Sequence, residues 1–149
     1  MANILIIYGT GSGNTEIVAE KVAEILAEKG HAVCLQRVEE SKIDDIEKHD
    51  VAVFACPTYD EGLLFPVFEP FAYALEKTDL KGKKCAVIGL GDVKYNLYYH
   101  LESAYILENI VKKAGGALIS PALMISGTPI KQLNKIVKTW AEKLADLIK

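Results

Sequence analysis

The most constraining feature of the chain is an alternation between short, continuously apolar runs and longer segments with one apolar face. The runs are rich in β-branched residues, as in residues 2–8 (ANILIIY) and 50–56 (DVAVFAC). Such short uninterrupted runs are typical of strands that are buried on both faces. The segments between them place apolar residues at helical spacing, for example Val18, Val22 and Leu26. The alternation predicts a parallel sheet covered by helices on both sides.

The expected elements alternate from one end of the chain to the other. Strands are expected at 2–8, 31–38, 50–56, 83–91 and 117–126, and helices at 14–29, 41–48, 66–76, 101–114 and 130–147. This order predicts an α/β fold with a doubly wound five-stranded parallel sheet, forming one domain over residues 1–149. Pro121 lies inside the fifth strand and lacks a ladder N–H, so that strand should be an edge strand or an interrupted one.

Charge and hydropathy narrow the classes of function. The chain carries a net charge of −3, and no basic patch suggests a nucleic-acid partner. Its N-terminus has no positively charged region, its first apolar run is too short for a signal peptide, and no run approaches the ~18 apolar residues of a membrane span. We therefore expect a cytoplasmic protein, acting as a monomer without a membrane or nucleic-acid partner.

Several chemically distinctive side chains are expected to be structural. Cys34, Cys56 and Cys85 lie in or beside strand-like runs and form no C-x-x-C pair, and the three His residues are scattered, so no metal site is predicted. Trp140 belongs to the apolar stripe of the C-terminal helix, which comprises Ile130, Leu133, Ile136, Val137, Trp140, Leu144 and Leu147.

The loop after the first strand, residues 9–15 (GTGSGNT), has the composition of a phosphate-binding loop without any Lys or Arg. Its glycines allow close backbone approach, the hydroxyls of Thr10, Ser12 and Thr15 can contact an anion, and the following helix presents its positive end. Main-chain donors and hydroxyls can thus hold a phosphate without a formal charge. An ordinary strand-to-helix turn is the alternative interpretation of this loop.

Two better-known phosphate motifs fit this loop poorly. A P-loop needs a Lys that is missing here, which argues against nucleoside triphosphate chemistry. The dinucleotide fingerprint G-x-G-x-x-G is matched by Gly9 and Gly11 but has Asn14 at its third position. Glu39 and Glu40 after the second strand keep a dinucleotide interpretation open.

Two further loops follow buried strands and carry one tyrosine each. They are residues 55–62 (ACPTYDEG), with Tyr59, and residues 88–96 (IGLGDVKYN), with Tyr95. Since ligands of such sheets bind beyond the carboxyl ends of the strands, a flat aromatic ligand is expected between the two rings. Each stacked face contributes about 0.5–1.5 kcal/mol beyond area burial.

Taken together, the three loops resemble those of flavodoxins, and the resemblance covers the whole chain. The motifs are YGTGSGNTE, PTYDEG and GLGDVKY, and the missing insertion in the fifth strand makes the chain resemble the short-chain type. The resemblance implies FMN as cofactor, the strand order 2-1-3-4-5 and single-electron transfer. The contacts that it implies are Thr10, Gly11, Ser12, Gly13, Asn14 and Thr15 for the phosphate, and Pro57, Thr58, Tyr59, Asp60, Gly62, Leu90, Gly91, Asp92, Tyr95 and Tyr98 for the remaining flavin.

The resemblance also implies a role as an electron carrier and not as an enzyme. Its partners would be a flavodoxin reductase-like donor and an acceptor oxidoreductase, docking on an acidic rim that lowers the second potential. The charges near the ring-binding loops are Asp60, Glu61, Glu69, Asp92 and Glu102 against Lys94. Asp60 stands where the family usually has Gly, whose backbone is more permissive, so we expect a less favourable first reduction than in a Gly-containing relative.

Three alternatives remain at this stage. The first is an NAD(P)H-dependent FMN or quinone reductase on the same fold, although no extra nicotinamide motif is present. The second is a phosphate-binding receiver-like module, which would need acidic residues where the first strand ends in Tyr8-Gly9 and the third in Cys56-Pro57. The third is a flavodoxin that has lost its flavin.

Overall fold

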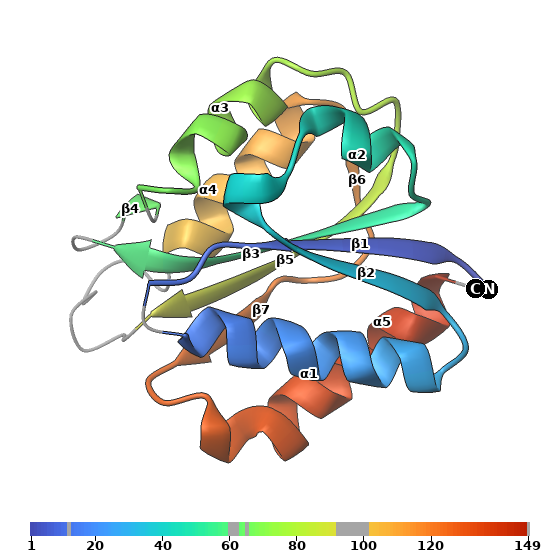
Figure 1. Cartoon of the computed structure of the whole chain (residues 1–149), viewed down its shortest axis with the longest axis vertical. Coiled ribbons are helices and arrows are strands. Elements are labelled where there is room, and N and C mark those ends of the chain that lie inside the picture. The colour runs from blue at the N-terminus through green and yellow to red at the C-terminus, as the bar shows by residue number, and fades with distance from the viewer. Residues whose placement is uncertain (12, 60–62, 65, 92–101, 149) are drawn as a thin grey trace.

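The sheet has the strand order that the resemblance to flavodoxins implies. The computed structural model of the chain describes residues 1–11, 13–59, 63–64, 66–91 and 102–148. Its strands run in the order β2-β1-β3-β5-β6, with β7 beside the carboxyl half of β5 (Figure 1). The parallel strands are β1 (Asn3–Tyr8), β2 (Ala32–Arg37), β3 (Val51–Tyr59), β5 (Lys84–Gly91), β6 (Ala117–Leu118) and β7 (Leu123–Ser126). The α/β class and the doubly wound order are confirmed.

The expected fifth strand consists of two pieces. β6 pairs with the start of β5 and β7 with its end, and the segment between them contains Pro121. The indole N–H of Trp140 donates to the Pro121 carbonyl at 2.8 Å, which ties this interruption to the C-terminal helix. One strand was not predicted: β4 (Leu63–Leu64) pairs antiparallel with the end of β3. With two residues, it is too short for a hydrophobic pattern to reveal.

Helices cover both faces of the sheet (Figure 1). α1 (Asn14–Glu28) and α5 (Lys138–Ile148) lie on one face. The other face carries α2 (Ile43–Glu47), α3 (Glu69–Glu76) and α4 (Glu102–Lys113). Alternate residues of β1 enter separate cores: Ile4 and Ile6 pack with α1 and α5, while Leu5 and Ile7 pack with the other helices. None of the helices in the described part of the chain has the length and apolarity to cross a membrane.

The apolar stripe expected on the C-terminal helix is wrong in part. Ile130, Ile136 and Leu147 are 63%, 45% and 51% exposed. The chain enters this helix through a 3-10 turn at Ile130–Gln132 and a π-helical turn at Leu133–Val137. These turns have other residue spacings than an α-helix, so the face that meets the sheet changes. The buried residues are Val137, Ala141, Leu144, Ala145 and Ile148, and half-buried Trp140 packs against them as expected.

Candidate functional site at the carboxyl edge of the sheet

A cleft of about 340 Å³ lies where β1, β3, β5 and β7 end. Its walls come from the carboxyl ends of β3 and β5 and from the segments that follow β1 and β7, at the edge where the arrowheads of β3 and β5 point (Figure 1). Its lining residues are Gly11, Asn14, Thr15, Pro57, Thr58, Leu90, Gly91, Gly127 and Thr128. The three loops singled out from the sequence therefore meet at one place, as the topology requires.

The first loop presents the start of a helix to this cleft. α1 begins at Asn14, and the residue before it, Gly13, has a φ of 96° and makes no side-chain cap. The first-turn N–H groups of a helix have no intrahelical acceptor, so they attract an anion. Thr15, only 1% exposed, adds a hydroxyl to the same wall. This donor set fits a phosphate.

Thr10 shapes this loop through its hydroxyl oxygen. Its Oγ1 accepts a hydrogen bond from the Gly13 N–H at 2.8 Å, which holds the loop in a tight turn. The Gly9 N–H donates to the Ala55 carbonyl at 3.0 Å and thereby joins the loop to β3. The loop is therefore shaped by its own hydrogen bonds, while the amides at the start of α1 lie at the cleft.

The second loop is anchored by a buried hydroxyl network. The Ser103 Oγ–H donates to the Cys56 carbonyl at 3.0 Å, and the Thr58 Oγ1–H donates to Ser103 Oγ at 3.0 Å. The Ser103 N–H in turn donates to Thr58 Oγ1 at 3.3 Å. Ser103 is fully buried near the start of α4. The network fixes the end of β3, which lines the cleft, to the helix that follows the third loop.

Gly89 allows α4 to lie this close to β5. A Cβ at Gly89 would lie 2.7 Å from the Ala104 Cβ and 3.0 Å from the Ala104 backbone N. Both atoms belong to the helix itself and cannot rotate away. The sequence placed Gly89 at the end of a strand and at the start of the GLGDVKY motif without predicting its contact with α4, and no motif pointed to Ser103.

The loop after the fifth strand completes the cleft and was also missed. The Gly127 N–H donates to the Gly91 carbonyl at 2.8 Å. The Gln132 side-chain amide donates to the Ser126 and Thr128 carbonyls at 2.9 and 3.0 Å. One signal was available for Gly127 and Thr128: they follow a strand of the parallel sheet directly, as the other three loops do. No signal pointed to Gln132.

A polar cluster lies beneath the first loop. The Tyr8 hydroxyl donates to Glu16 Oε2 at 2.6 Å, and an Arg37 guanidinium N lies 3.4 Å from the same oxygen. The Arg37 guanidinium also lies over the Tyr8 ring, 5.9 Å from its centroid. Burial and the Glu16 carboxylate raise the pKa of Tyr8 to about 12. The hydroxyl therefore remains a hydrogen-bond donor throughout the neutral range.

Comparison with known proteins identifies the family. Residues 6–140 match the family model described as Flavodoxin. The flavodoxin of Maridesulfovibrio salexigens is 36% identical over 151 residues, which cover 99% of this chain and 100% of that relative. The chain belongs to the flavodoxin family. Flavodoxins are FMN-binding electron-transfer proteins and not enzymes, so the expected cofactor and the expected class are confirmed.

Solved structures agree with this assignment. A short-chain flavodoxin associated with a PDU bacterial microcompartment has a TM-score of 0.91 at 28% identity, with 100% of both chains covered. The Fusobacterium nucleatum flavodoxin bound to flavin mononucleotide has a TM-score of 0.84 at 19% identity, again with 100% of both chains covered, and that likeness concerns the fold alone. The resemblance to the short-chain type is confirmed.

Part of the predicted flavodoxin site lies outside the described residues. This applies to Ser12, Asp60, Gly62, Asp92, Tyr95 and Tyr98, and to Glu61 and Lys94 of the expected charged rim. Tyr59 ends β3, but its side chain is not described. The tyrosine sandwich and the effect of Asp60 therefore stay predictions. Glu69, the remaining acidic residue with a described side chain, lies in the first turn of α3.

The thiols of this flavodoxin do not belong to the cleft. Cys34, Cys56 and Cys85 all lie in described strands and form no disulfide. Burial raises the pKa of the Cys85 thiol to about 12, which keeps it protonated and unreactive. In the described ranges no group of three or more His, Cys, Asp or Glu side chains is arranged to hold a metal ion.

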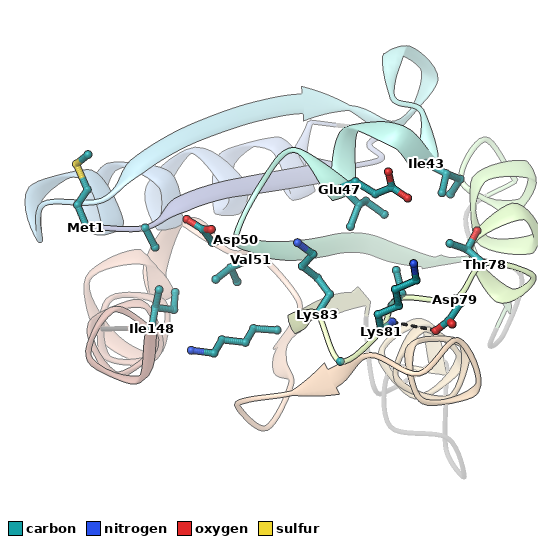
Figure 2. A pocket seen from close by; sticks show the side chains of 15 residues that line it. Met1, Ile43, Glu47, Asp50, Val51, Thr78, Asp79, Lys81, Lys83 and Ile148 are labelled. Carbon is teal, nitrogen blue, oxygen red and sulfur yellow. Dashed lines mark hydrogen bonds between the residues drawn. The ribbon is translucent and has the colours of Figure 1, made fainter.

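A larger hollow, of about 690 Å³, lies at the opposite edge of the sheet (Figure 2). Met1 and Ile148 line it, so both ends of the described chain meet there. Two of its polar groups bond to the backbone: the Lys83 ammonium donates to the His49 carbonyl at 2.6 Å, and Asp50 accepts from the Asn3 N–H at 2.8 Å. None of the predicted site residues lies in this hollow.

Proposed function

We propose that the chain is a low-potential single-electron carrier that binds FMN in the cleft at the carboxyl edge. The observation that carries the proposal is the start of α1, which follows the side-chain-free Gly13 and opens into a cleft lined by three of the segments that resemble flavodoxin motifs. When bound, FMN supplies the one-electron chemistry, while the chain binds, orients and shields it. No side chain needs to act as an acid, a base or a nucleophile.

The phosphate of the cofactor belongs at the start of α1. Asn14 and Thr15 form that end of the cleft, and the amides of the first turn supply donors without a positive side chain. An anion there is stabilised by the oriented peptide dipoles of the helix. This arrangement also explains why residues 9–15 need no Lys or Arg.

The flavin ring belongs between the second and third loops. Pro57 and Thr58 form one wall of the cleft, and Leu90 and Gly91 form another. We propose that Tyr59 and Tyr95 stack on the two faces of the ring, and that backbone groups near Asp60 and Asp92 contact its polar edge. The Ser103 network supports this end because it holds Thr58 in place.

The proposed low reduction potential and the proposed partners both follow from the negative charge of the ring-binding loops. Acidic residues outnumber basic ones in the ring-binding loops, and a neighbouring negative charge disfavours the addition of another. The same residues would attract basic surfaces of a reductase-like donor and of an acceptor oxidoreductase. We propose that the protein acts in the cytoplasm as a monomer between two such partners. Association with the reductase should weaken steeply with added salt. An association that does not depend on salt would contradict the proposed attraction between acidic and basic surfaces.

Flavin titration tests the proposed function. Purified chain stripped of flavin is titrated with FMN, and the flavin fluorescence is followed. We expect quenching that saturates at one FMN per chain, and Thr15→Val should weaken the affinity about tenfold because a buried hydroxyl partner is lost. Thr78→Val is the matched control, since the Thr78 hydroxyl bonds to the Ala74 carbonyl away from the cleft. Unquenched fluorescence with excess FMN would refute the proposal.

A further inference from the structure

The phosphate loop is closed at its base by a side-chain hydrogen bond. Tyr8 is the last residue of β1, and Glu16 is the third residue of α1, so the two residues flank loop residues 9–15 directly. The Tyr8 hydroxyl donates to Glu16 Oε2 at 2.6 Å. Tyr8 is 6% exposed while the Glu16 side chain is 32% exposed, so the bond is partly shielded from water. The distance between the two ends of the loop is therefore fixed by side chains as well as by the sheet and the helix.

A third residue joins this bond from the neighbouring strand. Arg37 is the last residue of β2 and is directly opposite Tyr8 in the parallel ladder. Its guanidinium lies 3.4 Å from Glu16 Oε2 and over the Tyr8 ring, and it also approaches Glu39 at 3.8 Å. Within the described part of the first loop, residues 9–11 and 13–15, no side chain is cationic.

The Glu16 carboxylate poses an electrostatic problem for an anion site. It lies in the first turn of α1, where a negative charge is favoured by the helix dipole. A phosphate at the same helix end would be repelled by that carboxylate. The paired guanidinium offsets the negative charge. Because the side chains of the pair are 44% and 32% exposed, this compensation should be modest and sensitive to salt.

We propose that Tyr8, Glu16 and Arg37 act as positioning residues for phosphate recognition, with Tyr8 fixing the shape of the loop and Arg37 neutralising Glu16. This inference rests on the proposed function, since it assumes that the FMN phosphate binds at the start of α1. It adds that recognition of the phosphate depends on three residues that line no part of the cleft. The raised pKa of Tyr8, about 12, keeps the donor intact at neutral pH.

The test compares FMN with riboflavin, which has the same ring but no phosphate. Affinities of the full chain for both ligands are measured by fluorescence titration at low and at high salt. Tyr8→Phe removes the hydrogen bond without altering charge, so the FMN affinity should fall about tenfold at both salt concentrations. The riboflavin affinity should stay unchanged. A loss of folding would lower both affinities together, and circular dichroism checks this separately.

The charge part of the proposal has its own pair of variants. Arg37→Gln exposes the Glu16 carboxylate and should weaken FMN binding about threefold at low salt, with little effect at high salt. Glu16→Gln retains an acceptor oxygen for Tyr8 and removes the charge, so FMN binding should tighten by about the same factor at low salt. Glu24→Gln is the control, because Glu24 lies on the same helix and pairs with exposed Lys21 at 3.8 Å.

The outcomes separate the two proposals. If the unaltered chain binds FMN no more tightly than riboflavin, the phosphate site itself is refuted. If it prefers FMN but Tyr8→Phe retains the full preference, the structural role of Tyr8 is refuted while the proposed function stands. If Arg37→Gln and Glu16→Gln change FMN affinity in the same direction after correction with Glu24→Gln, the charge compensation is refuted.

Discussion

A hollow lies at each of the two edges of the sheet, the amino edge and the carboxyl edge. The two hollows differ in the polar groups beside them. At the amino edge, the larger hollow of about 690 Å³ has Lys83 and Asp50 bound to backbone groups of the chain. At the carboxyl edge, the cleft of about 340 Å³ is flanked by the start of α1, whose N-cap residue, Gly13, has no side chain. The volume of a hollow is therefore a poor guide to a binding site here. The main-chain N–H groups at the start of a helix are the better guide.

The difference has a physical origin in parallel sheets. Strands of the same direction place all their carboxyl ends at one edge, and the following helices begin there with unpaired N–H groups. At the other edge helices end and strands begin, and in this chain the termini and short turns occupy that place. Substitutions at the carboxyl edge should therefore alter flavin binding, while those at the amino edge should alter stability alone.

Gly89→Ala should have the largest effect. The added methyl group would lie 2.7 Å from the Ala104 Cβ and 3.0 Å from its backbone N, so α4 must move away from β5. Overpacking of this kind should lower the free energy of unfolding by about 3 kcal/mol and weaken FMN binding, because α4 holds the end of β3. Urea unfolding and FMN titration measure both effects.

Gly82→Ala is the control for this substitution at the amino edge. A Cβ there meets no atom within 4 Å, and the remaining strain comes from a φ of 78°. It should destabilise the protein by about 1 kcal/mol and leave the FMN affinity unchanged. Equal effects of the two alanines on FMN binding would contradict the distinction between the edges.

His31→Ala should come next in size and should affect stability only. The buried imidazole accepts from the Ala2 N–H through Nδ1 and reaches the Ala145 carbonyl through Nε2, each at 3.1 Å. Because Nδ1 must accept, we assign the proton to Nε2. Loss of this link between β1 and α5 should lower the free energy of unfolding by about 2 kcal/mol. If the FMN affinity falls together with the free energy of unfolding, the claim that substitutions at the amino edge affect stability alone would be contradicted.

Ser103→Ala should give a smaller loss of stability and a selective effect on the flavin ring. The hydroxyl holds the Cys56 carbonyl and the Thr58 side chain, so its loss should lower the free energy of unfolding by about 1.5 kcal/mol. Riboflavin and FMN affinities should fall together, because the ring end of the cleft is altered and the phosphate end is not. Ser120→Ala, whose exposed hydroxyl contacts the Pro121 carbonyl, should change neither. A loss of FMN binding with riboflavin binding unchanged would mean that Ser103 supports the phosphate end of the cleft and not the ring end.

Mildly alkaline pH, up to about 9.5, should produce the smallest effect. Burial raises the pKa of Cys85 from its ordinary value of 9.0 to about 12, and that of Tyr8 rises from 10.0 to about 12. The unfolded groups lose their protons first, so stability is complete below pH 9 and falls as the pH rises toward 12. By pH 9.5 the loss should be below about 1 kcal/mol.

Variants can assign this alkaline loss to the two groups. Cys85→Ala should remove the part that starts near pH 9, and Tyr8→Phe the part that starts near pH 10. Urea unfolding at a series of pH values measures both. If the stability of the unaltered chain rises between pH 9 and 11, the direction assigned here is wrong.

Local pattern was sufficient to predict most of the fold. Strand β1 alternates between two buried faces, and a continuous apolar run is the direct consequence. Pro121 predicted the interruption of the fifth strand because a missing N–H is a local property. The stripe on the C-terminal helix was wrong at Ile130, Ile136 and Leu147. A π-helical turn at Leu133–Val137 alters the residue spacing, and no residue of that segment indicates such a turn.

The site was predictable only where its residues form contiguous loops. Asn14, Thr15 and Thr58 line the cleft as expected because they lie near the carboxyl ends of strands, Thr58 at the end of β3 and the other two at the start of the helix after β1. Ser103 lies 45 positions from Thr58, and Arg37 lies 21 positions from Glu16. Contacts at such separations depend on which strands and helices become neighbours. Their chemistry therefore became visible only once the elements were in place.

The most direct test of the account is to map FMN onto the backbone by amide NMR. The full chain, labelled with nitrogen-15 and stripped of flavin, is titrated with FMN. We predict that the largest shifts occur at Gly11, Asn14, Thr15, Thr58 and Gly91, and that residues 78–84 at the amino edge do not move. Shifts concentrated in residues 78–84, with the start of α1 unchanged, would contradict the claim that open main-chain donors at the carboxyl edge bind the cofactor.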